Sequence, residues 1–256
     1  MSVFALKCIA LYLMVLDHIG FYFQETIPYG LYLFLRIVGR MSYPLFLFCM
    51  TQGYRHTRNR KKYLLRLYLG SLFMTGFSIF LDRFFPVDGL GYGFHNIFLS
   101  LFLVGISIST IEAFQKDRKK GLIMAGCIFV LQLWFSAAPR YLPVLRNYNG
   151  DVCTGLFPNL VLNEYGLLFI ILGIAMYFLY EQKETFSIVY LLFCIAQYSD
   201  EMLNGDGTPI QWFMVLALPL MLRYNGERGR SLKYFFYIFY PAHTFLLFYL
   251  ANFVWV

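Results

Sequence analysis

Long apolar stretches recur along the whole chain, and no other feature limits its fold as strongly. A helix needs roughly 20 predominantly apolar residues to cross a bilayer. Nine segments reach or approach that length, the seventh and eighth being short: residues 4–24, 30–52, 63–81, 94–114, 121–138, 164–181, 186–199, 209–222 and 233–255. The pattern predicts an all-α fold, a polytopic transmembrane helix bundle with about nine spans (eight to ten) that forms a single domain over residues 1–256.

The composition agrees with a membrane protein and argues against a nucleic-acid partner. Of the 256 residues, 59% are hydrophobic and 14% are charged, against about 45–50% apolar and about 25% charged in soluble domains. The net charge of +7 comes from lysines and arginines gathered in short loops, which is a signal of membrane orientation. The cysteines show no metal-ligand spacing, so no metal site is expected.

The positions of the positive residues predict the orientation of the chain. Fifteen of the 21 lysines and arginines fall on one side of the predicted bundle, in the loops 55–62, 116–120 and 223–233 and at Lys7 and Lys183. Cytoplasmic loops carry the excess of these residues. We therefore expect a multi-pass protein of a cell membrane, of the bacterial cytoplasmic type, with its N-terminus in the cytoplasm and its C-terminus outside.

Ionisable residues lie inside several of the apolar segments. Asp17 and His18 are neighbours in the first segment, Arg36 and Arg40 lie in the second, and His243 lies in the last. Such groups are costly in hydrocarbon, so they usually face a protein interior or a watery cavity and take part in chemistry or transport. Neighbours on a helix point about 100° apart. We expect Asp17 to pair with Arg36 or Arg40 and not to orient His18.

Lys7 and His18 form a second pattern. The eleven positions between them are almost three helical turns, which places both on one face of the first helix, about 16 Å apart. Histidine, with an ordinary pKa of about 6.5, is the usual general base. The candidate catalytic residues are His18 as the base, with Asp17, Arg36 and His243. The alternative for both histidines is a hydrogen bond inside the bundle without a catalytic role.

Basic residues near the predicted inner face are candidates for binding a donor that bears phosphates. Arginine is well suited to holding phosphates, although orientation alone also explains most of these charges. The candidates are Lys7, Arg40, Arg223, Arg228, Arg230 and Lys233. On the opposite side, the loops 139–163 and 200–208 either select an acceptor or are plain connectors. His95 and Asn96 begin the fourth segment, a position typical of a solvated helix start.

Several blocks of the sequence resemble the TraX family. They are LKCIAL…M…DHIG at residues 6–20, RIVGRMSYPLFLF at 36–48, GYRHTRNRKKYLLR at 53–66, YNGERGR at 224–230 and YFFYIFYPAH at 234–243. The family is named for a conjugation protein that acetylates a pilin subunit. It is similar to the multi-spanning acyltransferases, in which a basic residue precedes a first-span histidine by eleven positions. Lys7 and His18 reproduce that spacing, with lysine where arginine is more usual.

The resemblance implies acyl transfer. The donor substrate would be acetyl-CoA, and the acceptor a peptide N-terminus, a sugar or another small molecule at the outer face of the bilayer; a homodimer is compatible with this interpretation. Two other functions stay open. One is a transporter or exporter of a small polar solute that uses Asp17, Arg36 and Arg40, although no internal repeat supports it. The other is a non-catalytic subunit in which these charges only hold the helices together.

Overall fold

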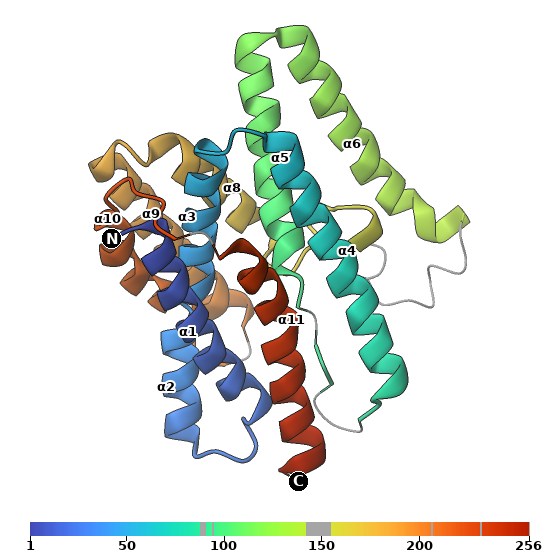
Figure 1. Ribbon diagram of the computed structural model, residues 1–256, viewed down its shortest axis with the longest axis vertical. Helices are drawn as coiled ribbons and strands as arrows, with labels where there is room; N and C mark the ends of the chain where they lie inside the picture. Colours follow the sequence, from blue (N-terminus) through green and yellow to red (C-terminus); the bar gives the residue numbers. More distant parts are fainter. Residues whose placement is uncertain (88–90, 94, 142–154, 206, 231, 256) are drawn as a thin grey trace. The chain divides into compact units, whose positions relative to one another are not determined.

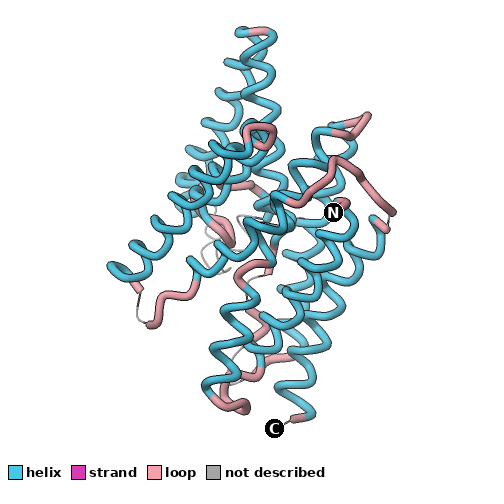
Figure 2. The backbone as a smooth tube through the Cα atoms, turned by 90° about the vertical axis from the view of Figure 1, so that its left-hand side faces the viewer, coloured by secondary structure: helices cyan, strands magenta, loops and turns pink. Residues whose placement is uncertain are grey.

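The computed structural model describes residues 1–255 except 88–90, 94, 142–154, 206 and 231, and the side chains of residues 135–141 and 233 also lie outside the description. The described residues form helices and connecting loops, without strands (Figures 1 and 2). They divide into two compact units, which are considered separately: Met1–His56 with Ala175–Val256, and Thr57–Ile174. The single domain expected over residues 1–256 stays a prediction.

The all-α class is confirmed, and each of the nine expected segments contains a helix. Among the described residues, six helical segments are long and apolar enough to cross a membrane: Val3–Tyr22, Tyr29–Arg55, Arg60–Phe84, Ile97–Lys116, Lys183–Asn204 and Tyr234–Val254. Gly166–Leu179 and Gln211–Leu222 are apolar but shorter. The eighth segment is therefore short as expected, but the expectation of a short seventh segment is wrong: Lys183–Asn204 has 22 residues, and the sixth segment holds the short helix of 14 residues. The fifth expected segment contains α6 (Arg118–Tyr141). The count of nine spans and the direction of the N-terminus stay predictions.

The first unit contains α1 (Val3–Tyr22), α2 (Tyr29–Gly39), α3 (Ser42–Arg55), the end of α8 (Gly166–Leu179), α9 (Lys183–Asn204), the 3-10 helix η2 (Gln211–Ala217), α10 (Leu218–Leu222), α11 (Lys233–Tyr249) and the π-helical turn η3 (Leu250–Val254). Helix α3 follows α2 almost without interruption, because Arg40 and Met41 keep right-handed helical backbone angles between them. The two helices therefore act as the one membrane-length segment that the sequence predicts.

The two ends of this unit differ in charge. At one end the Phe4 amide donates to the Arg228 carbonyl (3.1 Å), so the start of α1 lies beside the basic loop before α11 (Figure 1). At the other end the rings of Phe23 and Trp255 are 6.2 Å apart, so the chain finishes beside the turn after α1. Of the basic residues predicted to share a side, Lys7 and the loop that holds Arg223, Arg228 and Arg230 thus lie at one end of this unit.

Two glycines allow α1 and α2 to approach closely. A Cβ atom added at Gly39 would fall 2.3 Å from the Asp17 Cβ and 2.4 Å from its Oδ1. A Cβ at Gly20 would fall 3.1 Å from the Leu35 Cβ and 3.2 Å from the Arg36 Cδ. The missing side chain at Gly39 therefore leaves the space in which the Asp17 carboxylate sits.

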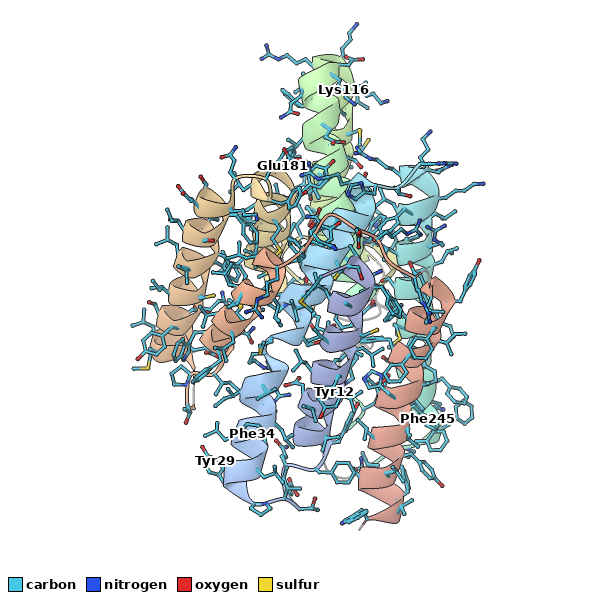
Figure 3. All side chains as sticks on the ribbon, turned by 60° about the vertical axis from the view of Figure 1, so that its left-hand side comes forward. Tyr12, Tyr29, Phe34, Lys116, Glu181 and Phe245 are labelled. Carbon is cyan, nitrogen blue, oxygen red and sulfur yellow. The ribbon has the colours of Figure 1, made fainter. Side chains whose placement is uncertain are left out.

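Large apolar side chains cover the outer faces of these helices. Tyr12 on α1 and Phe34 on α2 are 63% and 58% exposed, and both project from the unit in Figure 3. Helices that are apolar on their outer as well as their inner faces are typical of membrane spans. The surface therefore fits a hydrocarbon environment.

The second unit is built on α4 (Arg60–Phe84), α5 (Ile97–Lys116) and α6. Asn96 is the N-cap of α5: its side-chain oxygen accepts from the Leu99 amide (3.3 Å), and its amide group donates to the Ser71 carbonyl (3.2 Å) and to Thr75 Oγ1 (3.3 Å) on α4. The sequence predicts the cap correctly, but Asn96 is only 2% exposed. This helix start is buried, because its polar side chain joins two helices.

The second half of the long connection 139–163 packs on this unit. The Leu160 amide donates to Gln132 Oε1 on α6 (2.9 Å), and Ser100 Oγ on α5 donates to Asn163 Oδ1 (3.0 Å). Residues 142–154 lie outside the described part. A role of this loop in acceptor selection stays a prediction.

Candidate functional site

Asp17 holds two arginines. Its Oδ2 lies 2.9 Å from Arg36 Nη1, and its Oδ1 lies 2.5 Å from Arg40 Nη2. Arg40 Nη1 also donates to Gln211 Oε1 (3.1 Å), at the start of η2. The three charged side chains are between 16% and 19% exposed. The sequence predicts one of these two pairs, and the structure forms both, so one carboxylate connects α1, α2 and the turn that leads to α3.

His18 points away from this network and contacts the last helix. Its Nδ1 lies 2.8 Å from His243 Nε2, and the ring centroids are 4.9 Å apart. Both side chains are buried, at 8% and 6% exposed. Asp17 and His18 thus have separate partners, as helical geometry predicts, and two of the sequence-predicted catalytic residues meet directly although 225 positions separate them.

His243 is held by its own helix. Its Nδ1 lies 2.8 Å from the Phe239 carbonyl oxygen one turn earlier, and the Phe239 ring stacks on the imidazole with centroids 5.0 Å apart. Pro241 lies within this turn of α11, and a proline removes a backbone donor from a helix. The Phe239 carbonyl that contacts His243 lies two residues before this proline. This contact fits the hydrogen bond inside the bundle that is the alternative to a catalytic role for His243.

Lys7 and His18 face the same neighbouring helix. The Lys7 ammonium lies 5.4 Å from the centroid of the Phe236 ring on α11, and His18 meets His243 seven residues farther along that helix. Because α1 is continuous from Val3 to Tyr22, the two side chains stand about 16 Å apart on one face. These contacts agree with the shared face of Lys7 and His18, and the position of Lys7 at the cytoplasmic end stays a prediction. A solvent-filled passage between them stays a prediction.

The residues predicted to bind the donor divide between two places. Arg223, Arg228 and Arg230 are exposed in the loop between α10 and α11, and the backbone of this loop binds the start of α1. Lys7 lies one turn farther along α1. Arg40 lies with Asp17, about 20 Å along α1 from Phe4. Lys233 begins α11, and its side chain lies outside the described residues.

An aromatic cleft that the sequence does not predict lies at the same end of the first unit. It is lined by Phe48, Tyr180, Lys183, Phe186, Met221, Leu222 and Tyr224. Arg55 lies beside it, 4.8 Å from the ring centroids of both Tyr177 and Tyr180, and forms an ion pair with Glu181 (3.2 Å) in the turn between α8 and α9 (Figure 3). Burial raises the pKa of Tyr224. The aromatic residues come from three separate segments, so no local pattern reveals the cleft.

Other site residues also escape the sequence analysis. Gln211 Oε1 accepts a hydrogen bond from Arg40, and Ser42 Oγ donates to the Ala10 carbonyl (2.9 Å), which fixes α3 against α1. Of these residues, Gly39 beside Arg40 could be recognised from the sequence, because a glycine inside an apolar segment often marks a close approach of two helices. Among the described residues, no cluster of histidine, cysteine and carboxylate side chains fits a metal ion.

Comparisons with known proteins agree with the family resemblance of the sequence blocks described above. A protein of Dichelobacter nodosus named "Probable fimbrial assembly protein FimC, serogroup H1" is 26% identical over 263 residues, which covers 96% of this chain and 94% of that protein. No solved structure matches the chain significantly. The sequence model of the TraX protein family matches residues 2–139 and 152–251, which include Asp17, His18 and His243. The chain belongs to the TraX family.

Proposed function

We propose that the protein is a membrane-embedded acetyltransferase that uses acetyl-CoA from the cytoplasm and a hydroxyl or amine acceptor at or beyond the outer face. The proposal includes about nine spans and a cytoplasmic N-terminus. The observation that supports it most is the placement of Lys7 and His18 on one face of α1, with His18 meeting a second histidine. Intramembrane ionisable groups usually mark a functional site.

His18 is the general base in this mechanism. Its imidazole takes the proton of the acceptor O–H or N–H as the acceptor oxygen or nitrogen attacks the thioester carbonyl carbon of acetyl-CoA. The new ester or amide bond forms, the carbon–sulfur bond breaks, and the CoA thiolate leaves with the electron pair. The proton held by His18 can then pass to that sulfur. The step needs no further co-reactant.

The basic end of the first unit supports the choice of a donor with phosphates. Lys7, Arg223, Arg228 and Arg230 gather around the start of α1, and guanidinium groups bind phosphates through paired hydrogen bonds. Lys7 and His18 are about 16 Å apart, so a long donor molecule could place its anionic end at Lys7 and its reactive end at His18. An acyl-CoA has this shape, with phosphates at one end and a thioester at the other.

The transport alternative uses the Asp17 network as a pathway. In the structure this carboxylate binds both Arg36 and Arg40, and a residue that joins helices in this way suits a structural role. Asp17 and Arg36 then hold α1 in position, so that His18 faces α11. Solute flux into liposomes without acetyl-CoA consumption is the outcome that would favour transport instead.

The relative named for fimbrial assembly suggests one acceptor class to test first, a fimbrial subunit with its amino terminus or surface hydroxyls. The purified protein in nanodiscs is given radiolabelled acetyl-CoA and a panel of peptide and sugar acceptors. His18→Ala should lower the turnover by about 10²–10⁴-fold, the usual contribution of a general base. His56→Ala, at the exposed end of α3, is the matched control and should keep full activity. Undiminished turnover in His18→Ala would refute the assignment.

A further inference from the structure

We infer that His243 is a positioning residue that fixes which nitrogen of His18 carries the proton, and so makes His18 Nε2 the basic atom. The inference deepens the proposed function and rests on it for the identity of the reaction. It is carried by a chain of three groups: the Phe239 carbonyl, the His243 imidazole and the His18 imidazole.

The direction of the hydrogen bonds follows from the first group in the chain. A carbonyl oxygen can only accept, so the proton between it and His243 lies on His243 Nδ1. In a neutral imidazole the other nitrogen then carries the lone pair. His243 Nε2 is therefore an acceptor, and the 2.8 Å contact requires His18 Nδ1 to donate. By the same rule, the lone pair of neutral His18 resides on Nε2.

This assignment opposes the ordinary preference of the side chain. Free histidine in water favours the tautomer with its proton on Nε2, whose lone pair lies on Nδ1. Here the Nδ1 lone pair would face the lone pair of His243 Nε2 at 2.8 Å, which is repulsive. The surroundings of His243 reinforce its role: the stacked Phe239 ring and the bond to its own helix limit rotation of the imidazole.

During transfer, His243 also stabilises the product of proton abstraction. When His18 Nε2 takes the acceptor proton, the ring becomes an imidazolium whose Nδ1–H remains bonded to His243 Nε2. A charged donor strengthens such a bond. His243 thus does for His18 what an orienting carboxylate does for the histidine of a serine protease, while Asp17 is committed to Arg36 and Arg40.

The first test reads the tautomer directly and needs no substrate. Protein with ¹⁵N-labelled histidine rings is studied in nanodiscs at a pH well above about 6.5, where an ordinary histidine is neutral. Protonated and bare ring nitrogens have well-separated ¹⁵N shifts, and His18→Asn assigns the resonances. The expected result is a proton on Nδ1 and a bare Nε2 for His18. A proton on Nε2 of His18 would overturn the inference.

Variants of His243 separate positioning from packing. His243→Phe keeps a ring but removes the acceptor, so His18 should revert towards the Nε2–H tautomer. His243→Gln places an amide oxygen near the position of Nε2 and should restore the Nδ1–H form. Thr244→Val is the matched control, because Thr244 is buried on the same turn and its hydroxyl donates to the Tyr240 and Pro241 carbonyls of its own helix; it should leave the His18 shifts unchanged.

The kinetic test uses the same variants. His243→Phe should lower kcat roughly 100-fold with little change in the KM for acetyl-CoA, less than the about 10⁴-fold loss for a charged orienting partner, and His243→Gln should recover part of it. If the tautomer pattern holds and the wild type transfers no acetyl group, the proposed function fails while the positioning role stands. If acetyl transfer is present and His243→Phe changes neither the tautomer nor kcat, the positioning role fails alone.

Discussion

Replacing Gly39 by alanine should destabilise the protein strongly, although alanine is the better helix former. The new methyl group would lie 2.3 Å from the Asp17 Cβ, 2.4 Å from Oδ1 and 2.6 Å from Cγ. Ordinary carbon contacts begin at about 3.4 Å, so α1 and α2 must separate by about 1 Å at this point, or the Asp17 side chain must leave its place. The obstacle includes the Asp17 Cβ itself, which cannot move without α1.

The expected cost has two parts. Overpacking of a close contact costs about 1–3 kcal/mol. Displacing the carboxylate from between Arg36 and Arg40 adds about 1–3 kcal/mol, less than the about 3–5 kcal/mol for breaking a fully buried pair, because these side chains keep 16–19% exposure. The sum, about 2–6 kcal/mol, is offset by less than about 1 kcal/mol of helix preference for alanine over glycine.

Two other glycines supply matched controls. Gly30 lies in the same helix with nothing within 4 Å of an added Cβ, so Gly30→Ala should be neutral or slightly stabilising. At Gly20 the added Cβ meets Leu35 and Arg36 at 3.1–3.2 Å, and the cost should be intermediate. The assay is equilibrium unfolding by SDS titration in mixed micelles. Equal stability of the Gly39 and Gly30 variants would refute the close packing of α1 on α2.

Two further predictions concern polar contacts that join helices. Asp17→Asn should lower the free energy of unfolding by about 2–4 kcal/mol, because it leaves two partly buried guanidiniums without their carboxylate. Replacing Asp17, Arg36 and Arg40 together by apolar residues of similar size should recover most of that stability. Both variants are measured by the same SDS titration. A triple variant less stable than Asp17→Asn would contradict this account. Ser42→Ala should lower the free energy of unfolding by about 1 kcal/mol, because it removes a buried hydrogen bond to α1. Ser187→Ala is the control: its exposed hydroxyl bonds its own helix, so stability should change by less than about 0.5 kcal/mol. Equal losses in the two variants would argue against the interhelical bond.

The sequence predicts a large part of this arrangement because membrane burial makes some residues conspicuous. Asp17 has few possible partners inside an apolar segment. Its pairing with the nearby arginines can therefore be predicted from the free-energy cost of an unpaired charge in hydrocarbon alone. The shared face of Lys7 and His18 follows from the helical period, which depends only on spacing. Both expectations rest on physics within one helix or between neighbouring segments.

The contacts that the sequence does not predict depend on tertiary packing. His243 is 225 positions from His18, and nothing in either segment fixes their relative rotation. Gln211 reaches Arg40 through a short 3-10 helix whose position no local pattern determines. The lengths of the apolar helices also escape the sequence: the seventh segment, expected to be short, forms the 22-residue α9, and the sixth forms the 14-residue α8. A helix of fewer than about 17 residues is ambiguous between a tilted span and a buried element.

The way α1 begins has a consequence for how the chain is made. The amides of Val3 and Phe4 donate to the carbonyls of Glu227 and Arg228 (2.9 and 3.1 Å), and the first amides of a helix otherwise have no partner within it. The two amides and the two carbonyls are 224 positions apart in the sequence (227 − 3 and 228 − 4), so translation delivers the carbonyls long after the amides. Helix α1 therefore forms these two contacts long after its own residues are made. Until then Ser2 Oγ can accept from the Ala5 amide, but the Val3 and Phe4 amides depend on water.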